Sequence, residues 1–126
     1  MNSVFIEVKE SLRLCGEVYV EGAKNALLPI VPATLLTHGI STIYNVSKFD
    51  DMQAMVNLLK AYNVHCDINE ESKSLTIDTT NIQNTIVDAS LYSSYRASTL
   101  FAGPLLARFK EVWIGMPGGD QIGKRP

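Results

Sequence analysis

The stretch Gly22-Ala23-Lys24-Asn25-Ala26 separates two apolar segments of different pattern. Before it, Leu12 to Val20 alternates apolar with polar residues, which predicts a strand. After it, an apolar run to about Thr37 predicts a helix, with Pro29 in its first turns and a bend at Pro32. The stretch is therefore a predicted strand-to-helix junction, and a mixed α/β fold follows from it.

The rest of the chain continues this alternation. A helix that starts at Asp50-Asp51 and ends near Tyr62-Asn63 is predicted by an apolar face of Met52, Met55, Val56, Leu58 and Leu59. Further strands are expected at 4–8, 41–46, 64–68, 74–77 and 111–116, a hairpin turn at 70–73, a loop over most of 81–90, and a helix over 94–109 with a kink at Gly103-Pro104. Repeated α/β units of this kind indicate the α/β class.

Composition excludes several classes of protein. The chain has 126 residues, 46% of them hydrophobic and 19% charged, which is enough apolar material for a folded core. A net charge of -2 argues against a nucleic-acid partner. The longest apolar stretch, Leu100 to Ala107, is too short to span a membrane, and the first residues do not form a signal peptide. We expect a cytoplasmic protein.

The two cysteines, Cys15 and Cys66, lie far apart and have no His or Cys neighbour at metal-ligand spacing. They indicate reduced thiols, and neither a metal site nor a cofactor is expected. Trp113 is expected in the core.

The junction at Lys24 is the first candidate for chemistry. Glycine allows a turn, a helix N-terminus offers free N–H groups, and Lys24 adds a positive charge, all of which suit a phosphate or carboxylate. The alternative is an ordinary helix start with an exposed lysine, which the short local pattern favours when taken alone. No Walker motif is present.

Arg96 and the chain after Met116 are the other two candidates. Arg96 opens the predicted third helix, where its charge opposes the helix dipole. A bound anion or a neighbouring carboxylate would compensate, and the local sequence does not decide between them. The segment Pro117-Gly118-Gly119-Asp120 continues to Lys124-Arg125-Pro126. It predicts either a catalytic lid or a long hairpin turn.

Together these places resemble one family, the UDP-N-acetylglucosamine enolpyruvyl transferases. The resemblance rests on three motifs in order: Gly22-Ala23-Lys24-Asn25-Ala26; Arg96-Ala97-Ser98 with Gly103-Pro104-Leu105-Leu106-Ala107-Arg108-Phe109; and Pro117-Gly118-Gly119 with Ile122-Gly123 and Arg125-Pro126. It covers essentially the whole chain. The sister enzyme of the shikimate pathway typically has Ser-Lys-Ser where this chain has Ala23-Lys24-Asn25, and it is a distant second.

The resemblance implies an inside-out α/β barrel built of repeated βαβαββ-type units, incomplete here. Its members are much longer and have two similar domains around a cleft. Residues 1–21 would pack on the second domain, and residues 22–126 would form part of the first catalytic domain. The chain is therefore expected to be an N-terminal portion that is inactive alone, or a non-catalytic fragment with weak affinity for anions or nucleotide sugars.

The resemblance also implies roles for single residues. Lys24 and Asn25 would contact phosphoenolpyruvate, with Lys24 also catalytic, while Arg96, Arg125 and Pro126 would contact the nucleotide sugar or the phosphates. Asp120 occupies the loop tip, where most members have cysteine, and would donate the proton. The partners implied are phosphoenolpyruvate and UDP-N-acetylglucosamine, in the first committed step of peptidoglycan synthesis.

Aspartate at position 120 imposes a physical condition. A cysteine with a pKa of about 8.5 holds its proton at neutral pH, whereas an aspartate at about 3.9 does not. The pKa of Asp120 must therefore rise by roughly 3, about 4 kcal/mol, before it can act as an acid. A bound phosphate dianion and loop closure would raise it. Because a carboxylate is a poor nucleophile towards the epoxide fosfomycin, resistance to that inhibitor is also expected.

Overall fold

The computed structural model describes residues 6–10, 13–47, 52–84, 86–94 and 96–118. Its elements, in chain order, are α1 (Lys24–Ala33), the 3-10 helix η1 (Thr34–Leu36), β1 (Ile40–Ile43), α2 (Met52–Ala61), β2 (His65–Asn69), β3 (Ser74–Asp78), α3 (Ala89–Ser93), the 3-10 helix η2 (Arg96–Phe101) and α4 (Ala102–Phe109). The expected order of helix, strand, helix, strand, strand is confirmed from α1 to β3. The fold is mixed α/β, as predicted.

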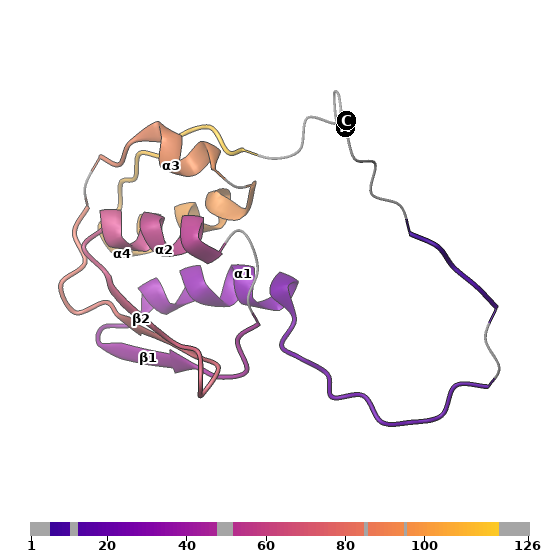
Figure 1. Ribbon diagram of the computed structural model, residues 1–126. Helices are drawn as coiled ribbons and strands as arrows, with labels where there is room; N and C mark the ends of the chain where they lie inside the picture. The colour runs from indigo at the N-terminus through magenta and orange to yellow at the C-terminus, as the bar shows by residue number, and fades with distance from the viewer. Residues whose placement is uncertain (1–5, 11–12, 48–51, 85, 95, 119–126) are drawn as a thin grey trace.

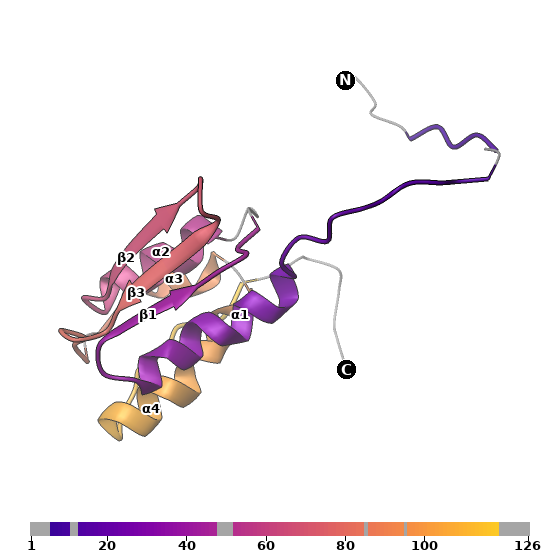
Figure 2. The ribbon, with the colours of Figure 1, turned by 90° about the horizontal axis from the view of Figure 1, so that it is seen from below.

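The sheet is small and antiparallel, with the strand order β1-β3-β2. The central strand β3 pairs Asp78 with Ile40 on one side and with His65 on the other. Asn69 faces Ser74 across the turn at 70–73, where the Asn69 Oδ1 accepts from the Ser72 amide at 2.9 Å, so the predicted hairpin is confirmed. The helices lie on one face of this sheet, which leaves two layers (Figures 1 and 2).

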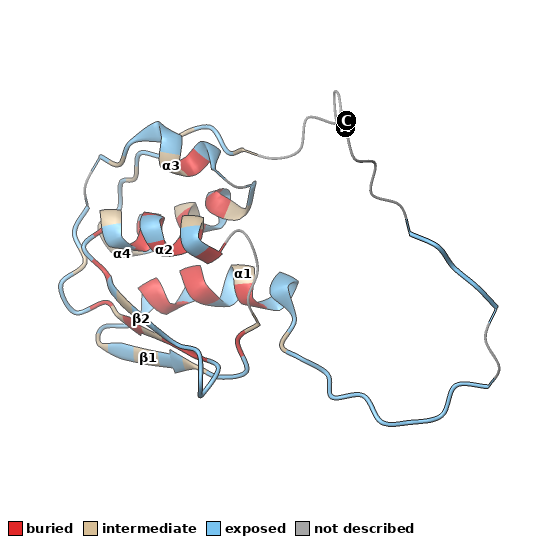
Figure 3. Cartoon of the chain, in the orientation of Figure 1, coloured by how far each residue is buried: buried red, intermediate tan, exposed pale blue. Residues whose placement is uncertain are grey.

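The core lies between the two layers, and Figure 3 shows it as the buried side of α1, α2 and the helices that follow. Leu35, Met55, Leu58, Leu75 and Ile77 are fully buried at 0% exposure. Met55 and Leu58 come from the predicted apolar face of α2, and Leu75 and Ile77 come from alternate positions of β3. The helical and strand periodicities therefore meet in one apolar cluster, as the sequence predicts.

Polar bonds at Arg108 and Thr79 join α4 to the end of the sheet. Nη1 of Arg108 donates to the Leu35 and Thr37 carbonyls at 2.9 and 2.5 Å, and its Nη2 donates to the Thr79 carbonyl at 3.2 Å. The Thr79 hydroxyl, fully buried, donates to the Thr37 carbonyl at 2.9 Å. Carbonyls left over at the end of η1 and β3 are thus satisfied by two side chains.

The helix predicted over 94–109 is confirmed as helical from Arg96 to Phe109, but it is not a single α-helix. The chain instead forms η2 and then α4, and the change of helix type falls between Phe101 and Ala102. Pro104 lies in the first turn of α4, where its missing N–H costs no helical hydrogen bond. The proline therefore favours a new helix start rather than a kink. In addition, α3 begins at Ala89, inside the segment expected to be mostly loop.

Three predicted strands are absent from the described residues. The chain forms no strand within 6–10, 13–20 or 111–116, and Val8, Val18 and Val20 are exposed by 87, 88 and 87%. Alternation predicts a strand only where a partner strand is present, and these segments have none in the chain described here. Trp113 is also 64% exposed, so its expected place in the core is wrong.

Candidate functional site

The N-terminus of α1 carries two of the candidate site residues, Lys24 and Asn25. Ala23 is its N-cap and makes no side-chain capping bond, and no acidic residue stands in the first turn. The amides of Ala26 and Leu27 both donate to the Ala23 carbonyl at 3.1 Å, and these two bonds close the first turn of the helix. The positive end of the helix dipole is therefore compensated by neither a cap nor a carboxylate of that turn.

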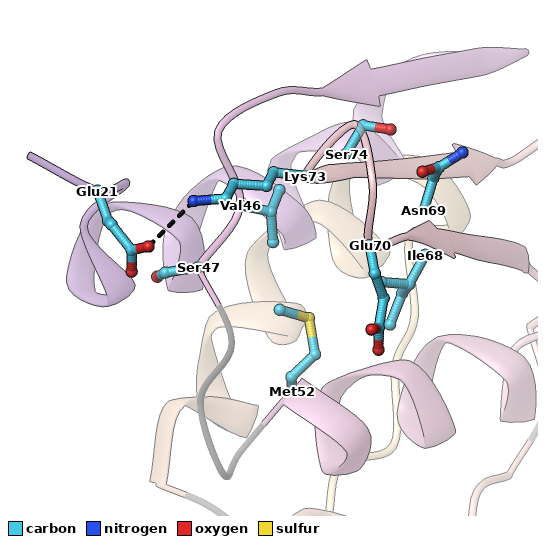
Figure 4. Close-up of a pocket in the computed structure, with 9 residues that line it drawn as sticks. All are labelled: Glu21, Val46, Ser47, Met52, Ile68, Asn69, Glu70, Lys73 and Ser74. Atoms are coloured by element: carbon cyan, nitrogen blue, oxygen red, sulfur yellow. Dashed lines mark hydrogen bonds and ion pairs between the residues drawn. The ribbon is translucent and has the colours of Figure 1, made fainter. Parts of the chain in front are cut away.

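The chain reaches this helix through a close backbone passage at Gly22. A Cβ atom at position 22 would stand 1.8 Å from the Asn45 carbonyl oxygen, so only glycine fits there. The Ser47 hydroxyl donates to the Gly22 carbonyl at 2.8 Å. Lys73 adds an ion pair to Glu21 at 3.0 Å, which Figure 4 shows. These contacts fix the segment directly before Lys24 against the end of β1 and the β-hairpin.

The same contacts border an apolar hollow that Figure 4 shows from the hairpin side. Val46, Met52 and Ile68 supply its apolar wall, and Glu21 and Lys73 are on its rim. Because Lys73 is paired with Glu21 there, this hollow lacks the cationic excess of an anion site.

Arg96 is brought to α1 by tertiary packing. It is the first residue of η2, which packs against α1. Lys24, Asn25 and Arg96 line one open depression of about 520 Å³. The remaining described residues that line it are Leu28, Ala97, Thr99 and Leu100. Two candidate motifs about 70 residues apart in the sequence thus form one surface.

The charge of this depression is positive. It holds one lysine, one arginine and one amide side chain, and none of the described residues that line it is acidic. Arg96 makes no ion pair with any residue that the structure describes, so the carboxylate alternative for its compensation finds no support there. An arginine and a lysine at a helix N-terminus can together hold a phosphate or a carboxylate.

The helix-dipole argument for Arg96 needs correction. Arg96 begins a six-residue 3-10 helix rather than the long α-helix predicted, so a large dipole does not act on it. Its place beside α1, and not its own helix, makes it part of the site.

The third motif is described only as far as Gly118. The Gly118 amide donates to the Tyr92 carbonyl at 3.2 Å, and a Cβ atom at position 118 would stand 1.8 Å from the Ser93 carbonyl oxygen. Asp120, Arg125 and Pro126 lie outside the described residues. Their predicted roles therefore stay predictions.

Sequence reasoning missed the groups that support the site. Ser98 is fully buried and donates to the Tyr92 carbonyl at 2.8 Å, and the hydroxyls of Tyr92 and Tyr62 contact each other inside the core. Burial raises the pKa of Tyr62 above its ordinary value. Ser98 stood within a motif that carried the resemblance, which was the only available signal for it.

The thiols and acidic groups offer little further chemistry. Cys15 and Cys66 are both free, and burial raises the pKa of the Cys66 thiol to about 11, which keeps it unreactive. In the described part of the chain, no three His, Cys, Asp or Glu residues lie close enough to share a metal ion. No helix of that part has the length and apolar character needed to cross a bilayer.

Known proteins are similar to this chain over nearly its whole length. Residues 8–126 match the family of EPSP synthase (3-phosphoshikimate 1-carboxyvinyltransferase). The chain is 36% identical over 122 residues to the UDP-N-acetylglucosamine 1-carboxyvinyltransferase of Sulfurimonas denitrificans, and 39% identical over 122 residues to UDP-N-acetylglucosamine 1-carboxyvinyltransferase 2 of Staphylococcus saprophyticus. These matches cover 97 and 96% of this chain but 29% of each relative.

A solved structure agrees with the fold. The enolpyruvyl transferase NikO from Streptomyces tendae superposes with a TM-score of 0.67 at 21% identity, over 77% of this chain and 22% of NikO. The two-layer unit of sheet and helices is thus part of an enolpyruvyl transferase fold. The chain, with all its elements from α1 to α4 inside the matched residues, belongs to the EPSP synthase family.

Proposed function

We propose that this chain is the N-terminal portion of a UDP-N-acetylglucosamine 1-carboxyvinyltransferase. The observation that carries the proposal is the depression in which Lys24, Asn25 and Arg96 meet at the N-terminus of α1. Its cationic character suits phosphoenolpyruvate, which carries a phosphate and a carboxylate. The identity of 36–39% to carboxyvinyltransferases of this name supports the choice of UDP-N-acetylglucosamine as the second substrate.

The proposed reaction is an addition followed by an elimination. The 3-hydroxyl of the sugar loses its proton to a base outside these residues, and its oxygen bonds to C2 of phosphoenolpyruvate while the electron pair of the double bond takes a proton at C3. The bond from C2 to the phosphate oxygen then breaks, phosphate leaves with the electron pair, and C3 gives up a proton to restore the double bond. Lys24 and Asn25 hold phosphoenolpyruvate, and Lys24 stabilises the charge on the phosphate as it departs.

The remaining roles concern residues beyond the depression and at its rim. Arg96, Arg125 and Pro126 contact the nucleotide sugar or the phosphates, and Asp120 supplies the proton to C3. Because an aspartate must be protonated for this step, Asp120 acts only when bound phosphate raises its pKa. Such a residue contributes roughly 10²–10⁴-fold to the rate. The same carboxylate makes the enzyme resistant to fosfomycin.

The domain assignment also remains a proposal. Residues 1–21 pack on a second domain, and residues 22–126 form part of the first catalytic domain. Support comes from Leu14, Val18 and Tyr19, which are exposed by 87, 88 and 91% in the segment before Gly22. Apolar side chains in such numbers are normally covered by another surface.

The chain spans 29% of the length of the relatives it matches, so we propose that these 126 residues do not turn over substrate alone. In the alternative, the chain is a non-catalytic fragment with weak affinity for anions or nucleotide sugars. The cytoplasm, peptidoglycan synthesis, and through it cell shape and division, are the proposed setting of the whole enzyme.

Calorimetric titration of phosphoenolpyruvate into the 126-residue chain tests the anion site. We expect weak binding that Lys24→Ala and Arg96→Ala each reduce about tenfold or more, the loss expected for a charge-assisted contact. Lys60→Ala is the control, because Lys60 lies in the last turn of α2 and not in the depression. Equal affinity for phosphoenolpyruvate in the wild-type chain and in the three variants would contradict the proposed anion site.

A fusion of residues 1–126 to the remainder of the Staphylococcus saprophyticus relative tests the enzyme proposal. We expect phosphate release from phosphoenolpyruvate only with UDP-N-acetylglucosamine present, no release by the 126 residues alone, and little by the Asp120→Asn fusion. A fusion that is folded but inactive with this sugar nucleotide would contradict the proposed function. Near-normal turnover of the Asp120→Asn form would contradict the role of Asp120.

A further inference from the structure

The C-terminal end of α3 holds two separate parts of the site by one carbonyl group. The last carbonyls of a helix have no partner within the helix and need donors from elsewhere. The Tyr92 carbonyl accepts from the Ser98 hydroxyl at 2.8 Å and from the Gly118 amide at 3.2 Å. Both lone pairs of one oxygen are therefore used, and the two donors come from segments on either side of α4.

Each donor stands two residues from a candidate site residue. Ser98 follows Arg96 within η2, and Arg96 lines the cationic depression. Gly118 precedes Asp120 in the sequence. The carbonyl oxygen of Tyr92 thus contacts both the helix that carries Arg96 and the chain that leads into the third motif, Pro117 to Pro126, called the glycine-rich motif below.

The anchor is buried and well formed. Tyr92 and Ser98 are both fully buried, so the serine hydroxyl has no access to water and depends on this acceptor. Asp88 caps the opposite end of α3, where its Oδ1 accepts from the Ser90 amide at 2.8 Å. The short helix is therefore satisfied at both ends, which makes it a rigid support.

Two glycines allow the C-terminal segment to lie directly on this helix. A Cβ atom at position 118 would stand 1.8 Å from the Ser93 carbonyl oxygen, and one at Gly115 would stand 2.9 Å from the Ala89 Cα. Residues 115–118 thus run along α3 from its first residue to its last, with backbone against backbone. Side chains at these two positions would separate the segment from the Tyr92 carbonyl.

We propose that Ser98 and Gly118 are positioning residues, which act through the shared Tyr92 carbonyl to set Arg96 and the entry to the glycine-rich motif at a fixed spacing. The proposal deepens the proposed function and rests on it for the role of Arg96. One physical consequence is that an anion that binds at Arg96 and shifts η2 also changes the hydrogen bond from the Gly118 amide to the Tyr92 carbonyl. Gly118 itself does not line the depression.

Amide hydrogen exchange in the ¹⁵N-labelled 126-residue chain tests the anchor without any ligand. In Ser98→Ala we expect the Gly118 amide to exchange about fivefold faster, which corresponds to about 1 kcal/mol. Ser94→Ala is the matched control, because the Ser94 hydroxyl donates to a different α3 carbonyl, that of Leu91, at 2.6 Å and is exposed. Unchanged exchange at Gly118 in a folded Ser98→Ala variant overturns the proposal.

Titration of the wild-type chain with phosphoenolpyruvate provides a second measurement, which does not depend on whether Ser98→Ala folds. We expect the amide signals of Arg96 and Gly118 to shift together with one dissociation constant, and the Ser94→Ala control to behave as wild type. A shift at Arg96 with none at Gly118 overturns the positioning role but leaves the anion site intact. If neither signal shifts, the proposed function fails at this site, and the exchange rates still decide whether Ser98 holds Gly118.

Discussion

Gly22 and Gly118 stand in the same relation to the site but are held by different layers of the molecule. Each precedes a candidate site residue by two positions, and at each a Cβ atom would stand 1.8 Å from a backbone carbonyl oxygen. The carbonyl at Gly22 belongs to Asn45, just after β1, whereas that at Gly118 belongs to Ser93 in α3.

The two passages also differ in the segments that they enter. Gly22 leads into α1, whose first two residues line the depression, and the Ser47 hydroxyl donates to the Gly22 carbonyl. Gly118 is held through its own amide, by the end of a five-residue helix. The chain before Lys24 is thus held by the segment that follows β1, and the chain before Asp120 is held by α3.

Gly22→Ala is expected to have the largest effect on stability. The methyl group must displace the Asn45 carbonyl or the start of α1, and both lie next to residues of the core, Val46 and Leu27. Overpacking of this kind costs about 3 kcal/mol of the free energy of unfolding. Urea denaturation followed by circular dichroism measures it.

Gly103→Ala is the control for this substitution. No atom lies within 4 Å of a Cβ at Gly103, and the residue is in α4. Alanine there should therefore raise the free energy of unfolding by about 0.5–1 kcal/mol, because it has a higher helix propensity than glycine. If both alanine variants had the stability of wild type, the close passage at Gly22 would be refuted.

Gly118→Ala is expected to cost less, about 1 kcal/mol, because the segment after α4 can move off α3 without opening the core. Its main effect should be faster proteolysis at residues 111–118, measured by limited digestion and mass spectrometry. A loss of stability equal to that of Gly22→Ala would show that the two glycines are held by one cooperative unit and not by two layers.

Thiol labelling tests which of the two glycine substitutions loosens the sheet. Cys66 lies in β2 with its pKa raised to about 11 by burial, whereas Cys15 is exposed, so iodoacetamide at about pH 8 should modify Cys15 first. We expect Gly22→Ala to speed the labelling of Cys66 severalfold and Gly118→Ala to leave it unchanged. Mass spectrometry of each peptide over time gives both rates, and acceleration by Gly118→Ala alone would reverse the assignment.

The same thiol predicts how stability depends on pH. The pKa of the Cys66 thiol is higher in the folded chain, about 11, than in the unfolded chain. The protonated thiol therefore contributes fully to the free energy of unfolding below about pH 9, and this contribution is lost as the pH rises through about 11. Cys66→Ala should therefore flatten the decline in unfolding free energy over this range. A decline of the same slope in both proteins would mean that Cys66 is not the group responsible.

Lys73→Ala is expected to have the smallest effect. The ion pair with Glu21 is exposed, with side-chain exposures of 55 and 65%, and such pairs contribute about 0.2–1 kcal/mol. The change should be measurable in low salt and absent at about 1 M salt, where the charges are screened. A salt-independent loss would indicate that the lysine stem, and not its charge, holds the segment before Gly22.

The sequence predicted those parts of the fold that depend on local pattern. The apolar face of α2 and the alternation of β3 each lead to one structure, and both were found. The alternation at 12–20 did not produce a strand in the described residues, because pairing depends on a partner strand that local pattern cannot supply. The division of 94–109 into η2 and α4 depends on how this segment packs against α1 and η1.

Sequence motifs identified three residues of the depression but not the groups that support it, and the roles of these residues stay predictions. Lys24, Asn25 and Arg96 were identified from motifs, and they do line one depression. The link from Ser98 through Tyr92 to Gly118 joins residues up to 26 positions apart by a backbone carbonyl, and side-chain identity carries no signal for such a contact.

Arg108 has a consequence for protein engineering. Its guanidinium ties α4 to η1, to the residue after η1 and to the residue after β3. In the described residues, the segments 24–79 and 88–109 are thus joined by packing, by this cation and by the contact of the Tyr62 and Tyr92 hydroxyls. A chain cut in the exposed stretch around Asn84 would leave two fragments that can be expressed separately. Their reassembly would report on Arg108, which makes this family unit a candidate for split-protein sensors.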